Sequence, residues 1–281
     1  MKEIQASKIT ETVERLCYEA AYNLGEDVEQ RIREMSPDEE SEFGKYALEQ
    51  ILENICYARA EGIAICQDTG TAVIFAEVGQ DVHITGGSLY DAINEGVRRG
   101  YQKGFLRKSI CSDPIFDRKN TGDNTPAVIH TEIVPGDKLK LILLPKGGGS
   151  ENMGQLKMLV PSQGLQGVKD FVLQCVTSAG GNPCPPIIVG IGVGGTMDKA
   201  TLLAKKALLR RIGEPNPDPR YAQLEKELFF EINATGIGPQ GLGGRITALA
   251  VHIEYFPTHI TQLPVAVNLN CHAARRAEAV L

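Results

Sequence analysis

Residues 186–195 read Pro-Ile-Ile-Val-Gly-Ile-Gly-Val-Gly-Gly, and this stretch does most to decide which fold the chain can adopt. Its apolar part, Ile187–Val189, is short and β-branched, as expected of a buried strand. A pattern of helical period follows the glycines over residues 196–211. A strand that passes through glycines into a helix predicts an α/β arrangement, with the glycines in a tight turn.

The same glycines, Gly190 to Gly195, fit the pattern G-x-G-x-x-G, which places a dinucleotide pyrophosphate at a helix N-terminus. That fold also requires a second strand ending in an acidic residue about 20 residues later. Residues 210–215 instead read Arg-Arg-Ile-Gly-Glu-Pro, a helix end followed by a loop. We therefore favour a structural turn whose N–H groups could still meet an anion, and keep a nucleotide-binding module as a remote alternative.

Helical patterns dominate the beginning of the chain. Ile9 and Val13 begin a series of apolar residues spaced by three and four, which places them on one helical face. Ser36 and the proline after it form an N-cap signal for another helix, whose apolar face we expect to include Phe43. The sequence therefore predicts a helical N-terminal segment over about 1–62.

Beyond this segment, strand patterns mix with helical ones. The strands that flank Pro135-Gly136-Asp137 are expected to pair as a hairpin, because this tripeptide favours a tight turn. The mixture predicts the α/β class (mixed α+β), with mixed sheets flanked by helices, in a single domain over 1–281. Expected strands are 63–66, 72–78, 127–134, 138–144, 246–255 and 265–269; expected helices are 88–99, 165–176, 221–232 and a short one at the C-terminus.

The composition is that of an ordinary globular protein. Hydrophobic residues make up 42% of the 281 residues and charged residues 23%, with a formal net charge of -6. This acidic balance argues against nucleic acid as a partner. Apolar runs such as Leu141–Leu144 are far shorter than the roughly 20 residues that a membrane span needs, and the N-terminus lacks the apolar core of a secretory signal. We expect a cytoplasmic chain that binds neither nucleic acid nor membrane.

Seven cysteines and 30 glycines are the unusual counts. A chain without an export signal keeps its thiols reduced, so the cysteines are either small buried residues or metal ligands. Cys17, Cys56 and Cys175 lie within helical apolar patterns, and we expect them to pack in the interior. Cys111 lies in a loop, and its role is left open.

The other three cysteines, Cys66, Cys184 and Cys271, lie at strand edges or in loops, where a thiolate can reach a shared cleft. Each alone is more simply a structural residue, and a structural metal in a noncatalytic protein is a further alternative. Their wide spacing excludes compact zinc patterns but not an iron–sulfur cluster, whose ligands can come from distant loops. A four-iron cluster held by three thiolates leaves one iron without a protein ligand, a Lewis acid suited to removing hydroxide from a β-hydroxy acid.

Four motifs occur in order along the chain: Cys66-Gln67-Asp68-Thr69-Gly70; residues 120–126, Asn-Thr-Gly-Asp-Asn-Thr-Pro; residues 146–152, Lys-Gly-Gly-Gly-Ser-Glu-Asn; and residues 268–275, which contain Cys271-His272. With these motifs the chain resembles, over nearly its whole length, the α subunit of the class I fumarate hydratase and L-tartrate dehydratase family. The resemblance implies an oxygen-sensitive hydro-lyase with a 4Fe-4S cluster on Cys66, Cys184 and Cys271. His272, beside a ligand, is a candidate for tuning the cluster by hydrogen bonding.

The resemblance also implies roles for residues near the substrate. Gln67 lies at the substrate, and Asp68 orients or shares the catalytic proton, a task suited to a carboxylate beside a cluster ligand. Arg107 binds a substrate carboxylate through its planar guanidinium, and Gly149 offers a backbone contact. His259 is implied as an active-site histidine. Without the resemblance, Arg107 is simply a solvated arginine and His259 a structural histidine.

The resemblance further implies a partner. Single-chain members have a second domain with further arginines, a lysine and a catalytic threonine, whereas this chain stops at Leu281. It therefore resembles the large subunit of the two-subunit form, and we expect a β subunit, an α2β2 assembly and an inactive isolated chain. The expected reaction is the reversible hydration of fumarate to (S)-malate, a citric acid cycle step. Dehydration of L(+)-tartrate to oxaloacetate is the alternative, because the two dicarboxylate substrates differ by one hydroxyl.

Overall fold

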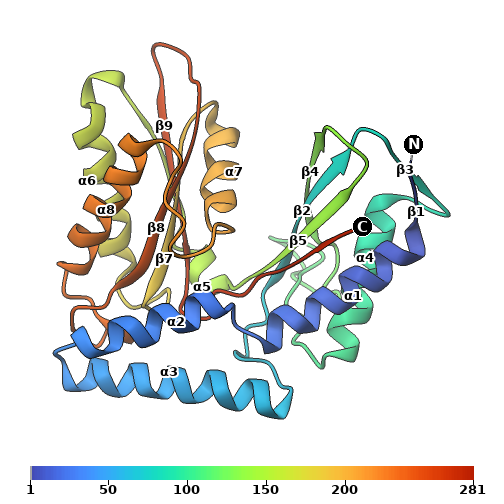
Figure 1. Cartoon of the computed structure of the whole chain (residues 1–281), viewed down its shortest axis with the longest axis horizontal. Helices are drawn as coiled ribbons and strands as arrows, with labels where there is room; N and C mark the ends of the chain where they lie inside the picture. Colours follow the sequence, from blue (N-terminus) through green and yellow to red (C-terminus); the bar gives the residue numbers. More distant parts are fainter. Residues whose placement is uncertain (1) are drawn as a thin grey trace. The chain divides into compact units, whose positions relative to one another are not determined.

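The computed structural model describes residues 2–281, which divide into two compact units (Figure 1). The first unit consists of residues 2–24, 55–148 and 275–281, and the second of residues 25–54 and 149–274. Helices and strands are mixed in both units, so the predicted α/β class is confirmed. Within residues 2–281, no helix combines the length and the apolar character that crossing a membrane requires.

The first unit is built on a four-stranded sheet in the order β10-β5-β2-β4. Helices α1 (Ala6–Tyr22) and α4 (Leu89–Lys103) pack against each other and share one core with the sheet. Burial of apolar side chains such as Ile9, Ile93 and Leu141 is the main stabilising contribution. The sheet strands are β2 (Thr71–Gly79), β4 (Val128–Val134), β5 (Leu139–Lys146) and β10 (Ala277–Val280); β1 (Lys2–Gln5) and β3 (Val82–Thr85) form a separate parallel pair.

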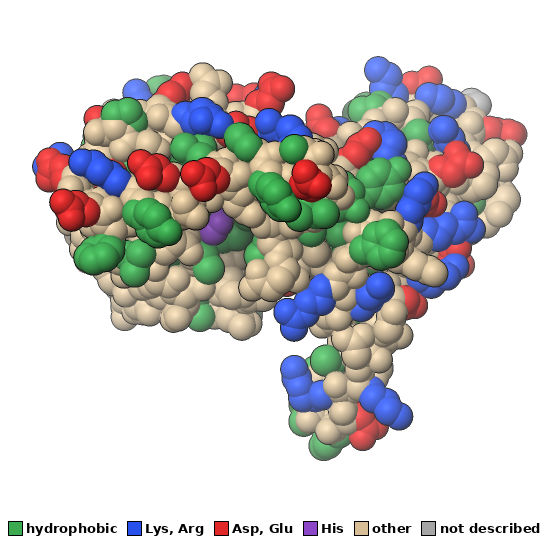
Figure 2. Space-filling view, turned by 90° about the horizontal axis from the view of Figure 1, so that it is seen from below, with side chains coloured by type: hydrophobic (Ala, Val, Ile, Leu, Met, Phe, Trp, Pro, Cys, Tyr) green, Lys and Arg blue, Asp and Glu red, His purple; other side chains and the backbone are tan. Residues whose placement is uncertain are grey.

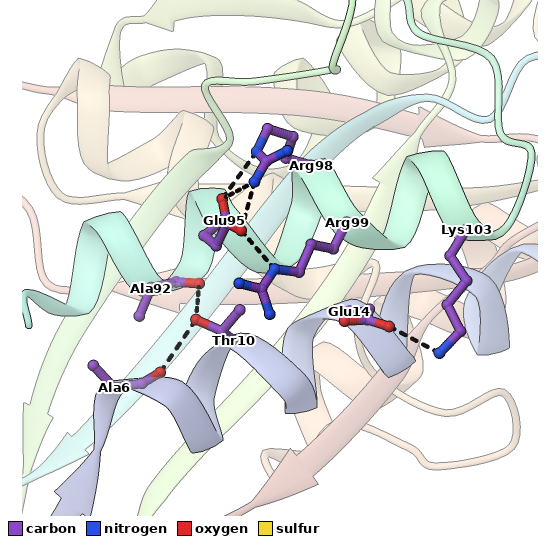
Figure 3. A network of polar contacts seen from close by, with 8 residues as sticks. All are labelled: Ala6, Thr10, Glu14, Ala92, Glu95, Arg98, Arg99 and Lys103. Carbon is purple, nitrogen blue, oxygen red and sulfur yellow. Dashed lines mark hydrogen bonds and ion pairs between the residues drawn. The ribbon is translucent and has the colours of Figure 1, made fainter. Parts of the chain in front are cut away.

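The close approach of α1 to α4 depends on glycine. A Cβ on Gly96 or Gly100 of α4 would lie 2.6 Å from a side-chain carbon of α1. Because these glycines let the two helices approach closely, the Thr10 hydroxyl of α1 donates a hydrogen bond to the Ala92 carbonyl of α4 at 3.0 Å (Figure 3). Larger residues at these two positions would force the helices apart, because interiors are close-packed.

The predicted hairpin over residues 127–144 is wrong, because β4 and β5 do not pair with each other. β2 lies between them, parallel to β4 and antiparallel to β5. The connection between β4 and β5 therefore crosses the end of β2. There the N–H of Gly79 donates to the Lys138 carbonyl at 2.8 Å, and a Cβ on Gly79 would lie 2.5 Å from the Gly136 oxygen. The turn residues favour a reversal, but nothing local in the sequence indicates that another strand is inserted.

The second unit is built on a four-stranded sheet in the order β6-β9-β7-β8. Helices α6 and α8 cover one face of it and α7 the other (Figure 1). Buried aliphatic side chains fill the space between the sheet and α6 and α8. The strands are β6 (Gln155–Leu159), β7 (Ile187–Gly194), β8 (Ala248–Phe256) and β9 (Leu263–Asn270); the helices are α2 (Glu26–Met35), α6 (Gly164–Ala179), α7 (Met197–Ala207) and α8 (Pro219–Asn233).

Most of the glycines in residues 190–195 lie within β7 and not in a turn after it. Gly190 and Gly192 are paired with both neighbouring strands, and their Cβ atoms would fall 2.2 and 2.0 Å from carbonyl oxygens of α7. Only Gly194 and Gly195, with φ of 88° and 68°, form the turn. The turn is thus shorter than predicted, and two glycines serve close helix packing instead. Since Gly190 and Gly192 belong to a sheet ladder, the nucleotide-binding alternative loses its main support.

Gly192→Ala should lower the free energy of unfolding by about 3 kcal/mol, the upper end of ordinary overpacking. The atom in the way is the backbone carbonyl oxygen of Ala200, which no change of side-chain rotamer can move. Urea unfolding followed by circular dichroism measures the loss. Thr201→Ala, at an exposed position of α7, is the control and should change stability by less than about 0.5 kcal/mol. Equal effects of the two substitutions would contradict this packing explanation.

Other predicted elements also differ from the structure. Residues 63–66 are irregular and do not form a strand. The C-terminal segment is β10, paired with β5, and not a helix; its alternating burial suits a sheet edge. The helix expected from Ser36 is only a 3-10 turn there, and α3 (Glu42–Glu61) begins later. Helix α2 and strand β6 had no separate signal.

Helix α3 buries only one side of its surface. Leu48, Ile51 and Ile55 are buried, whereas Phe43, expected on the same face, is 71% exposed. Phe43 lies five positions before Leu48, and at about 100° per residue this spacing turns Phe43 well away from the buried face. Figure 2, viewed from below, shows hydrophobic side chains exposed on this surface.

A buried carboxylate fastens the start of α3 to the loop before β8. Glu39 is 1% exposed and accepts hydrogen bonds of 2.9–3.1 Å from four backbone N–H groups. Burial alone raises the pKa of Glu39, but these N–H groups together lower it further than burial raises it, so its pKa lies below the ordinary value. The donors are Glu40, Ser41, Arg245 and Ile246.

Glu39→Gln should therefore destabilise the chain at neutral pH by about 1–3 kcal/mol, because the amide replaces an accepting oxygen with a donor. A lowered folded-state pKa gives stability that is present above the unfolded pKa, about 4.3, and is lost as pH falls. The difference in the free energy of unfolding between the wild type and Glu39→Gln should therefore shrink below about pH 4. Urea midpoints across this range measure it, and a difference independent of pH would contradict the role of the ionised carboxylate.

Candidate functional site

The Cys66-Gln67-Asp68 segment forms an irregular turn in the first unit, between α3 and β2. Backbone donors hold both oxygens of the Asp68 carboxylate: Gly70 N–H donates to Oδ1 at 3.1 Å and Gly148 N–H to Oδ2 at 2.7 Å. The contact with Gly148 brings the first part of the glycine-rich motif, residues 146–148, against this turn. Two backbone N–H groups thus fix the carboxylate in place, and the Cys66 thiol, half-buried, lies two residues before it.

Two buried side chains hold the turn by hydrogen bonds to its backbone carbonyls. The Tyr101 hydroxyl donates to the carbonyls of Thr69 and Gly70 at 2.8 and 3.0 Å, and Asn124 Nδ2 donates to Gly70 O at 3.2 Å. Burial raises the pKa of Tyr101 far above its usual value, so its hydroxyl remains a donor. Asn124 belongs to the motif of residues 120–126, and this contact explains how that motif lies next to the turn.

Arg107 is tied to the same turn through its backbone. The Thr69 hydroxyl donates to the Arg107 carbonyl at 2.8 Å, while the Arg107 side chain is exposed to solvent. The structure therefore ties the backbone of the predicted carboxylate-binding arginine to Thr69, the residue after Asp68. An exposed guanidinium suits the binding of an anionic substrate at the surface of this unit.

Arg275 is a residue of this region that the motif reading passed over. It is 1% exposed, and its Nη2 donates to the Asp68 carbonyl at 2.7 Å. The signal in the sequence was present, because Arg275 ends the motif of residues 268–275, but an arginine four positions after Cys271 gives no indication of burial.

In the second unit, the segments carrying Cys184 and Cys271 are held together. The Cys184 carbonyl accepts the backbone N–H of His272 at 3.3 Å and lies 3.0 Å from His272 Nδ1. Cys184 itself has a φ of 55°, the left-handed region that a non-glycine residue seldom adopts. The structure thus brings two of the three predicted ligands into neighbouring positions, on a strained loop and at the end of β9.

Gln240 completes this link and was not anticipated from the sequence. Its backbone N–H and its Nε2 both donate to the Pro185 carbonyl, at 2.8 and 2.7 Å. Nε2 also lies 3.0 Å from His272 Nδ1. The tautomer of His272 decides which of these two contacts forms a hydrogen bond. Without a proton, Nδ1 accepts from Gln240 Nε2; with a proton, it donates to the Cys184 carbonyl. The expectation that His272 acts by hydrogen bonding fits this position.

The last two predicted site residues, Gly149 and His259, differ in whether they lie near a cysteine segment. Gly149 belongs to the short helix α5 (Gly148–Glu151), and a Cβ there would lie 3.3 Å from the Asn182 carbonyl, so α5 approaches the Cys184 loop. His259 is exposed between β8 and β9, and its hydrogen-bonding partners are the hydroxyl and N–H of Thr261. In the described part of the chain, His259 has no hydrogen bond to either cysteine segment.

The cysteines divide by exposure. Cys17 and Cys175 are buried, and burial raises the pKa of both thiols, that of Cys175 to about 12, so both are inert packing residues as expected. Cys56 was expected in the interior but is exposed, because it follows the buried Ile55 by one position around α3. Cys111 is half-buried, and its backbone forms an isolated antiparallel β-bridge with Asn120.

Donor chemistry fits a thiolate-bound cluster. Cys66 and Cys271 are half-buried and Cys184 is exposed, and across residues 2–281 no cysteine forms a disulfide. The same residues contain no preformed group of three metal-binding side chains. Cysteine thiolates are the ligands that iron–sulfur clusters use, so Cys66, Cys184 and Cys271 are each chemically suitable as a ligand.

Comparison with known proteins gives a consistent result. A family model described as fumarate hydratase (Fumerase) matches residues 10–280. A Methanocaldococcus jannaschii protein, which carries the provisional name L(+)-tartrate dehydratase subunit alpha, is 44% identical over 274 residues, 96% of each chain. An Escherichia coli protein named L(+)-tartrate dehydratase subunit alpha is 34% identical over 279 residues, 98% of this chain and 91% of the relative.

Proposed function

Because the chain belongs to the fumarate hydratase (Fumerase) family and is thus a hydro-lyase enzyme, we propose that it is the α subunit of an iron–sulfur enzyme that interconverts fumarate and (S)-malate. One structural observation supports this most directly. The segments of Cys184 and Cys271 are joined by the hydrogen bond from His272 N–H to Cys184 O, which suits two ligands of one cluster.

The cofactor of this proposal is a 4Fe-4S cluster held by Cys66, Cys184 and Cys271. When bound, such a cluster supplies a Lewis-acid iron for the hydroxyl group that leaves or enters.

Residues of the chain itself would bind the substrate and handle the proton. Arg107 offers an exposed guanidinium for one carboxylate, Gln67 an amide, and Gly149 a backbone N–H. Asp68 has both carboxylate oxygens fixed by backbone donors, so it is oriented to hold or pass the proton exchanged between substrate and water. His259 is exposed and hydrogen-bonds to Thr261, and we propose that it faces the site once the enzyme is assembled.

Dehydration of L(+)-tartrate is the second candidate activity, and the names of both relatives favour it. The description of the matching family favours fumarate. The substrates differ by one hydroxyl, and an enzyme selects for a hydroxyl only through contacts placed for it. We propose that those contacts lie largely on a partner, since both relatives are named as alpha subunits.

The partner in this proposal is a β subunit, in a symmetric α2β2 assembly. The deciding experiment is anaerobic co-purification of the chain with that subunit, followed by iron and sulfide analysis and parallel assays with (S)-malate and L(+)-tartrate. Cluster-bearing complex that dehydrates malate faster than tartrate is the expected result, with the isolated chain inactive. Faster turnover of tartrate would establish the second candidate, and a complex with iron but no turnover of either acid would refute both.

A further inference from the structure

Arg275 is the largest fully buried side chain of the described residues, and it carries a charge. Its one described hydrogen bond runs from Nη2 to the Asp68 carbonyl at 2.7 Å. Nε and Nη1 are also buried, and in residues 2–281 neither has a hydrogen-bond partner. Guanidinium groups stay protonated at all physiological pH values, so a full positive charge lies beneath the turn with most of its donors unused.

Such an arrangement is costly for folding. Burying a charge without a counter-ion loses its hydration, and buried donors are almost always paired. A buried methionine or leucine would fill similar space at lower cost. An arginine at this position is therefore better explained by what it does for the Asp68 turn than by its contribution to stability.

Contacts around Arg275 converge on that turn. A Cβ placed on Gly147 would lie 3.2 Å from Asp68 Oδ2 and 3.9 Å from Arg275 Nη2, so the carboxylate and the guanidinium flank the same glycine. The backbone donors Gly70 and Gly148 fix the Asp68 carboxylate, and Arg275 fixes the carbonyl of the same residue. Asp68 is thus held through both its carboxylate and its carbonyl, and the donor to the carbonyl is a charged group.

We infer that Arg275 is a positioning residue for the Cys66-Gln67-Asp68 turn, an inference that rests on the proposed function. Its bond to the Asp68 carbonyl sets the direction in which the turn presents Cys66 and the Asp68 carboxylate. Its positive charge, with no acidic partner in hydrogen-bonding contact in the described chain, favours the anionic groups that the proposed site gathers there.

The test compares Arg275→Lys and Arg275→Met with Arg276→Lys, a matched substitution at the adjacent, only half-buried arginine. All are purified anaerobically as the complex with the partner subunit. Hydrogen exchange of residues 66–70, iron per chain, kcat and KM are measured. Arg275→Met should speed exchange of residues 66–70 and lower kcat by about 100-fold, the scale of small misplacements of reacting groups, with KM changed less than threefold.

Arg275→Lys keeps the charge and one donor nitrogen, so it should restore slow exchange and iron content and recover part of kcat; Arg276→Lys should resemble wild type. Unchanged exchange and kcat in Arg275→Met would overturn the inference, as would fast exchange throughout the first unit in Arg275→Lys, which would indicate a general loss of structure. Wild-type complex without iron or turnover would refute the proposed function instead, while the exchange measurements would still decide whether Arg275 holds the turn.

Discussion

Replacing Cys184 with serine is expected to abolish the brown chromophore of the anaerobically purified complex and at least 99% of its hydro-lyase activity. Cys66→Ser and Cys271→Ser should have the same effect, because serine is a poor ligand for the iron of a cluster that prefers thiolates. Iron and sulfide per chain, visible absorbance and malate dehydration are the measurements. A loss of this size follows only if all three thiols bind one cluster.

Matched controls come from the other cysteines. Cys56→Ser is an exposed substitution like Cys184→Ser, and Cys175→Ser changes a buried thiol. Both variants should keep iron and colour, although Cys175→Ser should lose some stability because a hydroxyl is buried in an apolar core. If Cys56→Ser lost iron as fully as Cys184→Ser, or Cys184→Ser kept it, the division of the cysteines would be wrong.

Local patterns predicted most helices and strands, because their signals lie within the element itself. Helix α4 shows this, since its N-cap Ser88 accepts a hydrogen bond from Asp91 N–H and its apolar face follows the helical period. Pairing was not predicted, because it depends on distant segments. The strands around Pro135-Gly136-Asp137 looked like a hairpin, yet β2 separates them. Likewise, the sequence places Gly192 in a turn, whereas a glycine is required there because the Ala200 carbonyl of α7 lies too close for a Cβ. Nothing near Gly192 in the sequence indicates that contact.

The candidate site shows the same division. Asp68, Gly148 and Asn124 could be named from motifs, and the structure supplies the hydrogen bonds that connect those motifs. Gln240 and Arg275 could not, since their roles arise from contacts with residues 32 to 207 positions away. A buried arginine and an exposed one are identical in sequence, and only the fold distinguishes them. Supporting residues of a site are therefore harder to predict than the residues that perform its chemistry.

Asp68→Asn should lower kcat by about 100- to 10,000-fold, the range expected when a general acid or base is removed, while iron content stays near wild type. Asparagine has nearly the same shape, and its oxygen can still accept one backbone N–H. Its amide cannot carry the proton, and Nδ2 cannot accept from Gly148 N–H as Oδ2 does at 2.7 Å. Steady-state kinetics with malate, together with iron analysis of the same samples, measures both effects.

The control is Asp113→Asn, because the Asp113 carboxylate also accepts backbone N–H groups, from Ile115 at 2.9 Å and from Phe116, but lies in an exposed loop. It should leave kcat within about twofold of wild type, as surface substitutions away from a site do. If Asp68→Asn lost iron in proportion to activity, Asp68 would be a positioning residue for the cluster turn. If it kept full activity, the proton would have to be carried by another group, and the proposed role of Asp68 would be wrong.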